Sequence, residues 1–443
     1  MAPETKSLIK WLVLVSIITA LAGCVQLSLA WAELKANGPA AQPDILAPFE
    51  GQKAVQNQAD WERRKPLVKA ALQREIFGLM PELATTTKLS HKVIAANALD
   101  GKASLEEIAF RVEISHRQRA TRQGATRLKS ADVTMVLLLP KSDRPVPVIM
   151  MQTFCPNSAT MPFAGVASTA SSCAGDGMMS KAMKYVFGRY IATPPLEMII
   201  DHGIGVATIY PPEFVPDRAD EGEQALRALQ FGPDAKIPTP ELATRWGAIA
   251  AWGWLYTSMV DILEDDPRLD QSALIAYGHS RYGKAALVGA AFDDRIDGVI
   301  SHQSGAGGAS LNKGKRGETV AKITRSYPHW FAPIYATYAD DPTRMSVDQH
   351  HLMALIAPRP VFLGNARRDV WSDPNASFEA SLGANPVYRL YGSEGLTAKR
   401  LDEFNPQADV SFFIRPGTHG VVEEDWPAFL LFLQAHFFDG GKY

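Results

Sequence analysis

The chain has 443 residues, of which 46% are hydrophobic, so it is long enough to bury one large core or two modest ones. Its 45 lysines and arginines nearly balance its 47 aspartates and glutamates, which leaves a net charge of −2. These charges are interspersed along the chain. No basic stretch indicates nucleic acid or another polyanion as a partner.

The first residues have the composition of an export signal. Lys6 and Lys10 precede the apolar run WLVLVSIITALAGC. This run ends in LAGC, which has the form of a lipoprotein signal that would leave a lipidated Cys24 as the mature N-terminus. We therefore interpret residues 1–32 as a signal peptide and expect a bacterial lipoprotein of the periplasm or the outer membrane, or a secreted protein.

Two other processing outcomes rank behind lipidation. The motif AWA fits ordinary signal cleavage before Glu33, and residues 11–32 are apolar enough to remain as a membrane anchor. All three outcomes place the folded domain outside the cytoplasm. In an oxidising compartment a disulfide between Cys155 and Cys173 is about as plausible as two separate buried thiols.

After the signal, the pattern indicates one catalytic domain. Residues 33–55 are rich in proline and glycine and predict a linker or extended arm, and residues 60–81 have a helical period in which Pro66 marks a kink or the first turn. Helices are also predicted over 241–264 and 283–292. Strands are predicted over 106–114, 133–140, 145–154, 203–210, 272–277, 296–302 and 359–365.

This alternation of strands and helices predicts the α/β class. We expect a doubly wound, mostly parallel sheet with an antiparallel start, formed by a single domain over residues 56–443. In such a sheet the reactive groups gather at the carboxyl ends of the strands. The polar residues that follow the predicted strands are therefore the first candidates for an active site.

Three of those residues have the types and the order of a hydrolase triad. Ser280 follows the strand predicted over 272–277, Asp369 follows the one predicted over 359–365, and His419 follows a further strand candidate, DVSFFIRPGT. Serine, acid and histidine occur in this chain order in α/β-hydrolases. A histidine makes the serine hydroxyl nucleophilic by taking its proton, and a carboxylate orients that histidine. Asp373, which precedes a proline, is interpreted as a turn residue.

The segment around Ser280, YGHSRYGKAAL, departs from the usual G-x-S-x-G elbow. Gly278 lies two residues before Ser280, but the second glycine, Gly283, comes three residues after it. Arg281 follows the serine directly, where its backbone N–H and guanidinium could stabilise a developing oxyanion. The alternative is that Arg281 only pairs with a surface carboxylate.

Several motifs resemble the glucuronoyl esterases, carbohydrate esterase family 15, of the bacterial type. GHSRYGK matches the elbow of that family, and further agreement occurs in SHQSGAGGASL, GETV, RSYPHWF, HLMALIAPRPVFLGNARRDVWSDP and GTHGVVEEDWPAFLLF. The resemblance is dense over residues 240–440. It implies an α/β-hydrolase fold, a three-layer α/β/α sandwich, and hydrolysis of the ester between 4-O-methyl-glucuronic acid of glucuronoxylan and lignin alcohols.

The resemblance also implies roles for particular residues. Ser280 would be the nucleophile, His419 the general base and acid, and Arg281 the oxyanion partner. Lys284, Glu318 and Trp371 match positions that bind the sugar. Many members have a glutamate as their triad acid where this chain has Gln303. Asp369 matches the other acid position of the family, so the triad would close through Asp369, with Gln303 left among the substrate-binding residues.

Two alternative functions stay open from the sequence. One is an esterase that removes acetyl groups from sugars, such as an acetyl xylan esterase, and the other is an inactive hydrolase fold that binds glycans as a lipoprotein. We expect no cofactor and no metal, a monomer, no nucleic-acid partner, and contact with a membrane only through an N-terminal lipid.

Overall fold

The computed structural model describes residues 11, 13–17, 44–81, 83–115, 129–167, 178–232, 238–314 and 316–438. Cys24, the alternative cleavage site before Glu33, and Cys173 lie outside the described residues. Cys155 is fully buried and disulfide-bonded. Within the described ranges, no helix combines the length and the apolar character needed to cross a bilayer.

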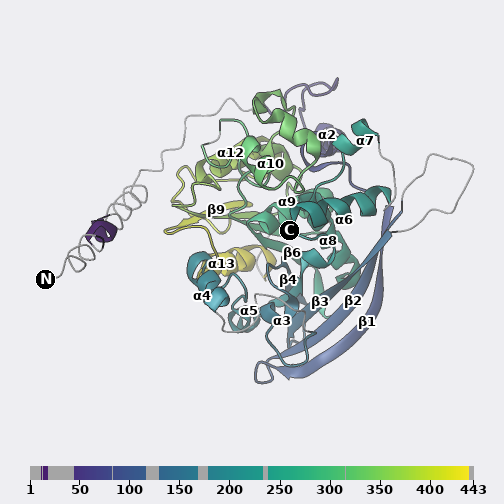
Figure 1. Ribbon diagram of the computed structural model, residues 1–443, viewed down its shortest axis with the longest axis vertical. Helices are drawn as coiled ribbons and strands as arrows, with labels where there is room; N and C mark the ends of the chain where they lie inside the picture. The colour runs from purple at the N-terminus through teal and green to yellow at the C-terminus, as the bar shows by residue number, and fades with distance from the viewer. Residues whose placement is uncertain are drawn as a thin grey trace, which may run out of the picture.

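A nine-stranded sheet forms the centre of the molecule (Figure 1). Its strands lie in the order β1-β2-β3-β5-β4-β6-β7-β8-β9. From β5 through β9 all neighbours are parallel, whereas β1, β2, β3 and β5 pair antiparallel. The strands are β1 (Leu83–Ala98), β2 (Ala103–Ser115), β3 (Lys129–Pro140), β4 (Val146–Gln152), β5 (Gly205–Ile209), β6 (Leu269–His279), β7 (Gly298–His302), β8 (Val361–Ala366) and β9 (Val410–Arg415).

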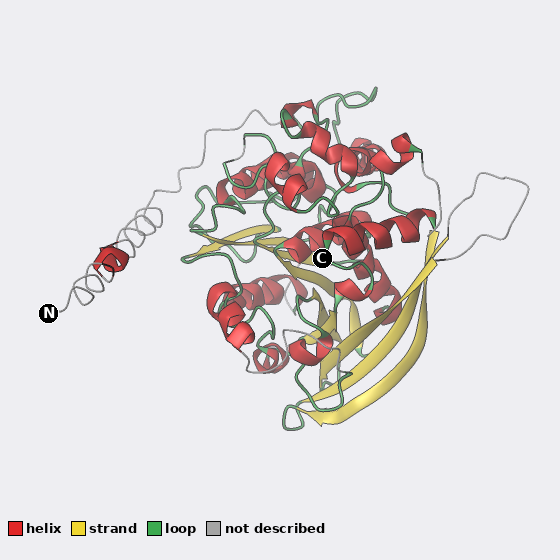
Figure 2. Ribbon diagram, in the orientation of Figure 1, coloured by secondary structure: helices red, strands yellow, loops and turns green. Residues whose placement is uncertain are grey.

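Helices cover both faces of this sheet, as Figure 2 shows. One face packs against α2 (Gln58–Leu72), α8 (Ala248–Leu263), α9 (Arg281–Phe292), α11 (Gln349–Ala354) and α12 (Pro374–Leu390). The other packs against α5 (Leu196–Asp201) and α13 (Asp425–Phe437). The other labelled elements are η1 (Gln73–Phe77), α3 (Asn157–Thr160), α4 (Met178–Phe187), η2 (Pro211–Glu213), α6 (Ala219–Phe231), α7 (Thr239–Ala243), α10 (Val320–Ser326), η3 (Pro333–Tyr338) and η4 (Pro342–Arg344).

The central strands are apolar on both faces because both faces are covered. In β6, Leu274 and Ala276 belong to the core cluster on the α8 and α9 side, while Ile275 faces the cluster that contains α13. Continuous apolar strands of this kind are expected in parallel sheets. The predicted three-layer α/β-hydrolase fold is confirmed.

The structure differs from the prediction at the helix expected over 241–264 and at β1. The helix predicted over 241–264 is two helices, α7 and α8, because the chain near Trp330 passes too close for a continuous helix. A Cβ on Gly247 would lie 2.1 Å from the Trp330 carbonyl oxygen. The long strand β1 was not predicted, since its exposed residues do not alternate cleanly between polar and apolar.

The arm predicted over 33–55 is described from residue 44 onward, where it packs against the domain. Ile45 and Val55 are buried in the main core cluster. The buried Arg64 of α2 donates hydrogen bonds to the carbonyl oxygens of Ala47 and Lys53, at 3.0 and 2.6 Å. Pro66 lies inside α2.

Asp297, at the start of β7, is predicted to destabilise the fold at neutral pH. Its carboxylate accepts a hydrogen bond from the Leu274 N–H at 2.8 Å, but burial outweighs this bond and raises the pKa of Asp297 to about 6. Stability from this group is therefore full below about pH 4 and falls as the pH rises through 6. We expect Asp297→Asn to raise the free energy of unfolding at pH 7 by about 1–3 kcal/mol.

Urea denaturation at pH 7 and at pH 4 measures this effect. The gain should be much smaller at pH 4, where the aspartate is protonated in the folded protein and about half protonated in the unfolded chain. An equal gain at both pH values would show that titration of Asp297 is not its cause.

Candidate active site

Ser280 occupies a strained turn between β6 and α9. Its φ and ψ are 56° and −120°, a left-handed region that non-glycine residues adopt only when their surroundings hold them there. The Ser280 N–H donates to the carbonyl oxygen of His302 at 2.8 Å, at the end of the neighbouring strand β7. This geometry projects the serine hydroxyl above the carboxyl end of the sheet, as in a nucleophile elbow.

The two glycines of the elbow allow the strand and the helix to approach closely. A Cβ on Gly278 would lie 2.0 Å from the Tyr282 carbonyl oxygen, and a Cβ on Gly283 would lie 2.9 Å from the Gly278 oxygen. Tyr282 is the additional residue between Ser280 and Gly283. Its ring is buried in the core, where it packs against Trp252 and Phe154. The longer spacing therefore retains the close contact that an elbow requires.

His419 and Asp369 face each other from the loops that follow β9 and β8. His419 Nδ1 lies 2.6 Å from Asp369 Oδ2, and the same oxygen accepts the Ser372 hydroxyl at 2.6 Å. Burial alone would raise the pKa of Asp369, but the hydrogen bonds and charge of His419, together with Ser372, hold it below its ordinary value. Asp369 is thus an anion that can orient His419.

Gln303 supports the histidine loop. Its Oε1 accepts the Gly420 N–H at 2.8 Å, directly after His419, while its own N–H donates to Gly364 at 2.8 Å. Its Nε2 is buried without a hydrogen-bond partner. The neutral side chain of Gln303 therefore holds the backbone of the His419 loop. The carboxylate that contacts the His419 imidazole belongs to Asp369.

Two further histidines pack behind His419, outside the cavity. The rings of His279 and His419 lie 4.6 Å apart, and Nδ1 of His279 lies 3.1 Å from Nδ1 of His302. Burial, together with the charges of His419, His302 and Arg415, lowers the pKa of His279 well below its usual value. His279 therefore presents a neutral ring to His419.

Arg281 both lines the cavity and forms an ion pair. Its guanidinium pairs with Asp217 and lies over the rings of Phe154 and Trp330, at 5.4 and 5.1 Å. Asp217 also accepts hydrogen bonds from His329 Nε2 at 3.1 Å and Trp330 Nε1 at 2.8 Å. The ion pair expected in the alternative interpretation is present, and it holds a guanidinium one residue from Ser280. Stabilisation of an oxyanion by Arg281 stays a prediction.

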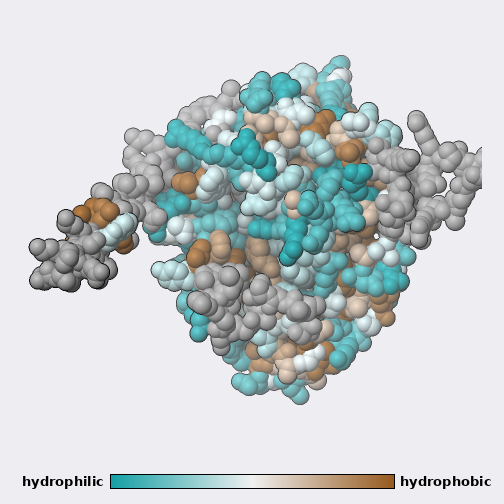
Figure 3. Space-filling view, viewed as in Figure 1, coloured by the Kyte–Doolittle hydropathy of each residue, from teal (hydrophilic) through white to brown (hydrophobic). Residues whose placement is uncertain are grey.

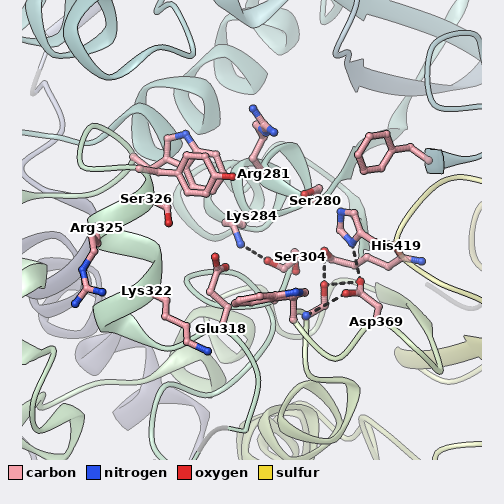
Figure 4. A pocket seen from close by; sticks show the side chains of 17 residues that line it. Ser280, Arg281, Lys284, Ser304, Glu318, Lys322, Arg325, Ser326, Asp369 and His419 are labelled. Carbon is pink, nitrogen blue, oxygen red and sulfur yellow. Dashed lines mark hydrogen bonds and ion pairs between the residues drawn. The ribbon is translucent and has the colours of Figure 1, made fainter. Parts of the chain in front are cut away.

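A cavity of about 640 Å³ opens beside Ser280 (Figure 4). All eight candidate residues line it. They are Ser280, Arg281, Lys284, Gln303, Glu318, Asp369, Trp371 and His419. The volume lies in the range of pockets that enclose small organic ligands.

The predicted sugar-binding residues differ in how they are held. The buried Lys284 amine donates to the carbonyl oxygens of Ser304 and Ala306, the latter at 2.7 Å. The Glu318 N–H donates to the Trp371 carbonyl at 3.0 Å, which keeps the two residues together. Trp371 is 56% exposed, so its indole is available to a ligand.

Sequence reasoning missed other residues of the cavity. Lys322 and Arg325 project from α10, and the rings of Tyr327 and Trp330 are stacked with their centroids 3.7 Å apart. The motif RSYPHWF contained a signal for the aromatic pair. No sequence pattern indicated Asp217, because it lies far from its partner Arg281 in the sequence.

Asp373 has the structural role expected of a turn residue. It caps α12 by accepting the Ala376 N–H at 3.2 Å, and its other oxygen accepts the N–H groups of Arg316 and Gly317. These bonds fix the segment that leads into Glu318. Asp373 is not among the residues that line the cavity.

The fold and the position of the cavity place the protein among the α/β-hydrolases. Residues 241–392 match the family model of fungal glucuronyl esterases. A carbohydrate esterase from an unknown prokaryotic organism is 38% identical over 249 residues, which cover 56% of this chain and 57% of that protein. The chain thus spans little more than half the length of this curated relative.

Two solved bacterial structures match over a greater length. A promiscuous esterase of carbohydrate esterase family 15 from a marine metagenome has 29% identity and a TM-score of 0.74, covering 92% of this chain and 99% of that one. A glucuronoyl esterase from Solibacter usitatus has the same identity and TM-score, covering 91% and 100%. The chain is similar to the glucuronoyl esterases of carbohydrate esterase family 15, as its motifs predicted.

Replacing the acid should separate the roles of Asp369 and Gln303. We expect Asp369→Asn to lower kcat by roughly 10³-fold or more, because an amide neither orients His419 correctly nor stabilises its imidazolium. Gln303→Ala removes only the oxygen that accepts the Gly420 N–H, so it should lower kcat far less than Asp369→Asn does. Steady-state kinetics on an ester substrate measures both, and near-normal activity in Asp369→Asn would refute the assignment.

Replacing Arg281 tests stabilisation of the oxyanion. We expect Arg281→Ala to lower kcat by roughly 10²-fold or more with a smaller effect on KM. Asp217→Asn keeps the guanidinium but removes its charged partner, so it should have a smaller effect on kcat. A change confined to KM in Arg281→Ala would show that Arg281 only binds substrate.

Proposed function

We propose that this protein is a serine carboxylesterase that hydrolyses esters of 4-O-methyl-glucuronic acid, such as those that join glucuronoxylan to lignin alcohols. The observation that carries the proposal is one cavity lined by Ser280, the His419–Asp369 pair and the Lys284, Glu318 and Trp371 side chains. Ser280 and the His419–Asp369 pair can cleave an ester. Lys284, Glu318 and Trp371 can bind a sugar.

The proposed reaction begins with attack of the Ser280 hydroxyl on the ester carbonyl while His419 takes its proton. Asp369 keeps Nδ1 of His419 protonated, so Nε2 is free to accept. The negative charge on the carbonyl oxygen is stabilised by the N-terminus of α9 and by Arg281. His419 then protonates the leaving alcohol, and water releases the uronic acid from Ser280 by the reverse sequence.

The contacts of the cavity support recognition of a uronate rather than a small acyl group. A carboxylate such as Glu318 can accept hydrogen bonds from neighbouring sugar hydroxyls, and an exposed indole such as Trp371 can pack against a sugar face. An acetyl ester would place its sugar on the alcohol side of the scissile bond. It would leave the acyl side of the cavity unfilled.

The substrate is tested by comparing benzyl glucuronate with 4-nitrophenyl acetate and acetylated xylose. We expect turnover of the glucuronate ester and little turnover of the acetyl esters, with Ser280→Ala as the inactive control. Comparable rates on both kinds of ester would favour a general sugar esterase. Binding of glucuronoxylan without any hydrolysis would favour the glycan-binding alternative.

We also propose that the protein is a monomer held at a bacterial membrane by a lipid on Cys24. Trp11, Val13, Leu14, Val15 and Ile17 of the N-terminal apolar run all expose their side chains. Figure 3 shows brown, hydrophobic surface on this segment at the left. Such a run suits an export signal. We expect diacylated Cys24 at the mature N-terminus by mass spectrometry, and a mature chain beginning at Glu33 would contradict this.

A further inference from the structure

Two cations lie at the end of the cavity away from the reacting groups. Figure 4 shows Lys322 and Arg325 at one end, with Ser280 and His419 at the other and Lys284 and Glu318 between them. Both cations come from α10. They are exposed at the mouth of the cavity.

Three other charged groups of the cavity near the serine have charged or polar partners. Arg281 pairs with Asp217, Asp369 with His419, and Lys284 donates to two carbonyl oxygens. Within the described residues, neither Lys322 nor Arg325 forms an ion pair with a carboxylate. The Lys322 ammonium instead lies 4.8 Å from the centre of the Trp371 ring, which holds it at the cavity.

The arrangement of the pair is unfavourable in the free protein. Lys322 and Arg325 are three residues apart on a helix and therefore share a face, where like charges repel each other. An anion between them would relieve that repulsion. The near-zero net charge of the chain conceals this local excess of positive charge.

The ester being cleaved does not supply that anion, because its carboxyl group is masked by the alcohol. A ligand that pairs with these two cations would have to bring a second negative group. A polysaccharide that contains uronate esters also contains free uronates, and a carboxylate is an anion that both lysine and arginine bind well.

We propose that Lys322 and Arg325 form a subsite for a free carboxylate on the same polysaccharide, so that the preferred substrate is a uronate ester in an acidic chain. This inference rests on the proposed function and narrows its substrate class. An exposed ion pair adds little binding free energy. Lys322 and Arg325 together should therefore raise kcat/KM for the acidic substrate by roughly three- to tenfold at low salt.

The test compares two esters that differ in one carboxylate. Each is a benzyl glucuronate linked to a second sugar, which is glucuronic acid in one and glucose in the other. In the wild-type protein we expect the acidic ester to have the higher kcat/KM in about 20 mM salt, with the advantage lost near 1 M salt, where the Debye length is about 3 Å.

The variant Lys322→Gln/Arg325→Gln should bring the ratio of the two kcat/KM values close to one. Lys88→Gln/Lys92→Gln is the matched control, because it removes the same charge from exposed positions on β1, which do not line the cavity. The control should keep the wild-type ratio.

Four results would overturn the inference. Equal kcat/KM values for the two esters in the wild-type protein would refute the subsite while leaving glucuronoyl esterase activity intact, as would a preference that persists in the double variant. Equal values together with inhibition by free glucuronate that the double variant relieves would show that the cations hold the product acid. Hydrolysis of neither ester would refute the proposed function and this inference together.

Discussion

The close approach of Gly278 and Gly283 across the Ser280 turn is the contact on which the site depends. A methyl group on either glycine would collide with the backbone, at 2.0 or 2.9 Å, and push α9 away from β6. The same contact lets the Ser280 N–H reach the His302 carbonyl. Together these interactions hold the serine in a backbone conformation that it would otherwise leave.

The histidine loop depends on a second set of contacts around the same strand ends. Asp369 fixes the His419 ring, Gln303 holds the Gly420 N–H, and the neutral ring of His279 packs against the imidazole. Gln303 and His279 come from the ends of β7 and β6, next to the serine. The nucleophile and the base are therefore positioned by one rigid edge of the sheet.

Much of the fold and part of the site followed from sequence patterns. Ser280, Asp369 and His419 could be found because each follows an apolar strand, and parallel strands bring their carboxyl ends to one edge of a sheet. The helix break near Gly247 could not be found, because its cause is the backbone near Trp330, about eighty residues away. For the same reason nothing indicated that Asp217 would pair with Arg281. Nothing in the sequence set Lys322 and Arg325 apart from other charged residues, because it is the fold that brings them to the cavity.

The central claim is that Ser280 is the reacting group, and covalent labelling tests it most directly. A phosphonate ester that mimics the tetrahedral intermediate should add once per chain, and mass spectrometry of the digested protein should place the adduct on Ser280. His419→Ala should slow labelling strongly, because the serine then loses its general base. Labelling of a different residue, or full hydrolytic activity in protein whose Ser280 is completely blocked, would contradict the account.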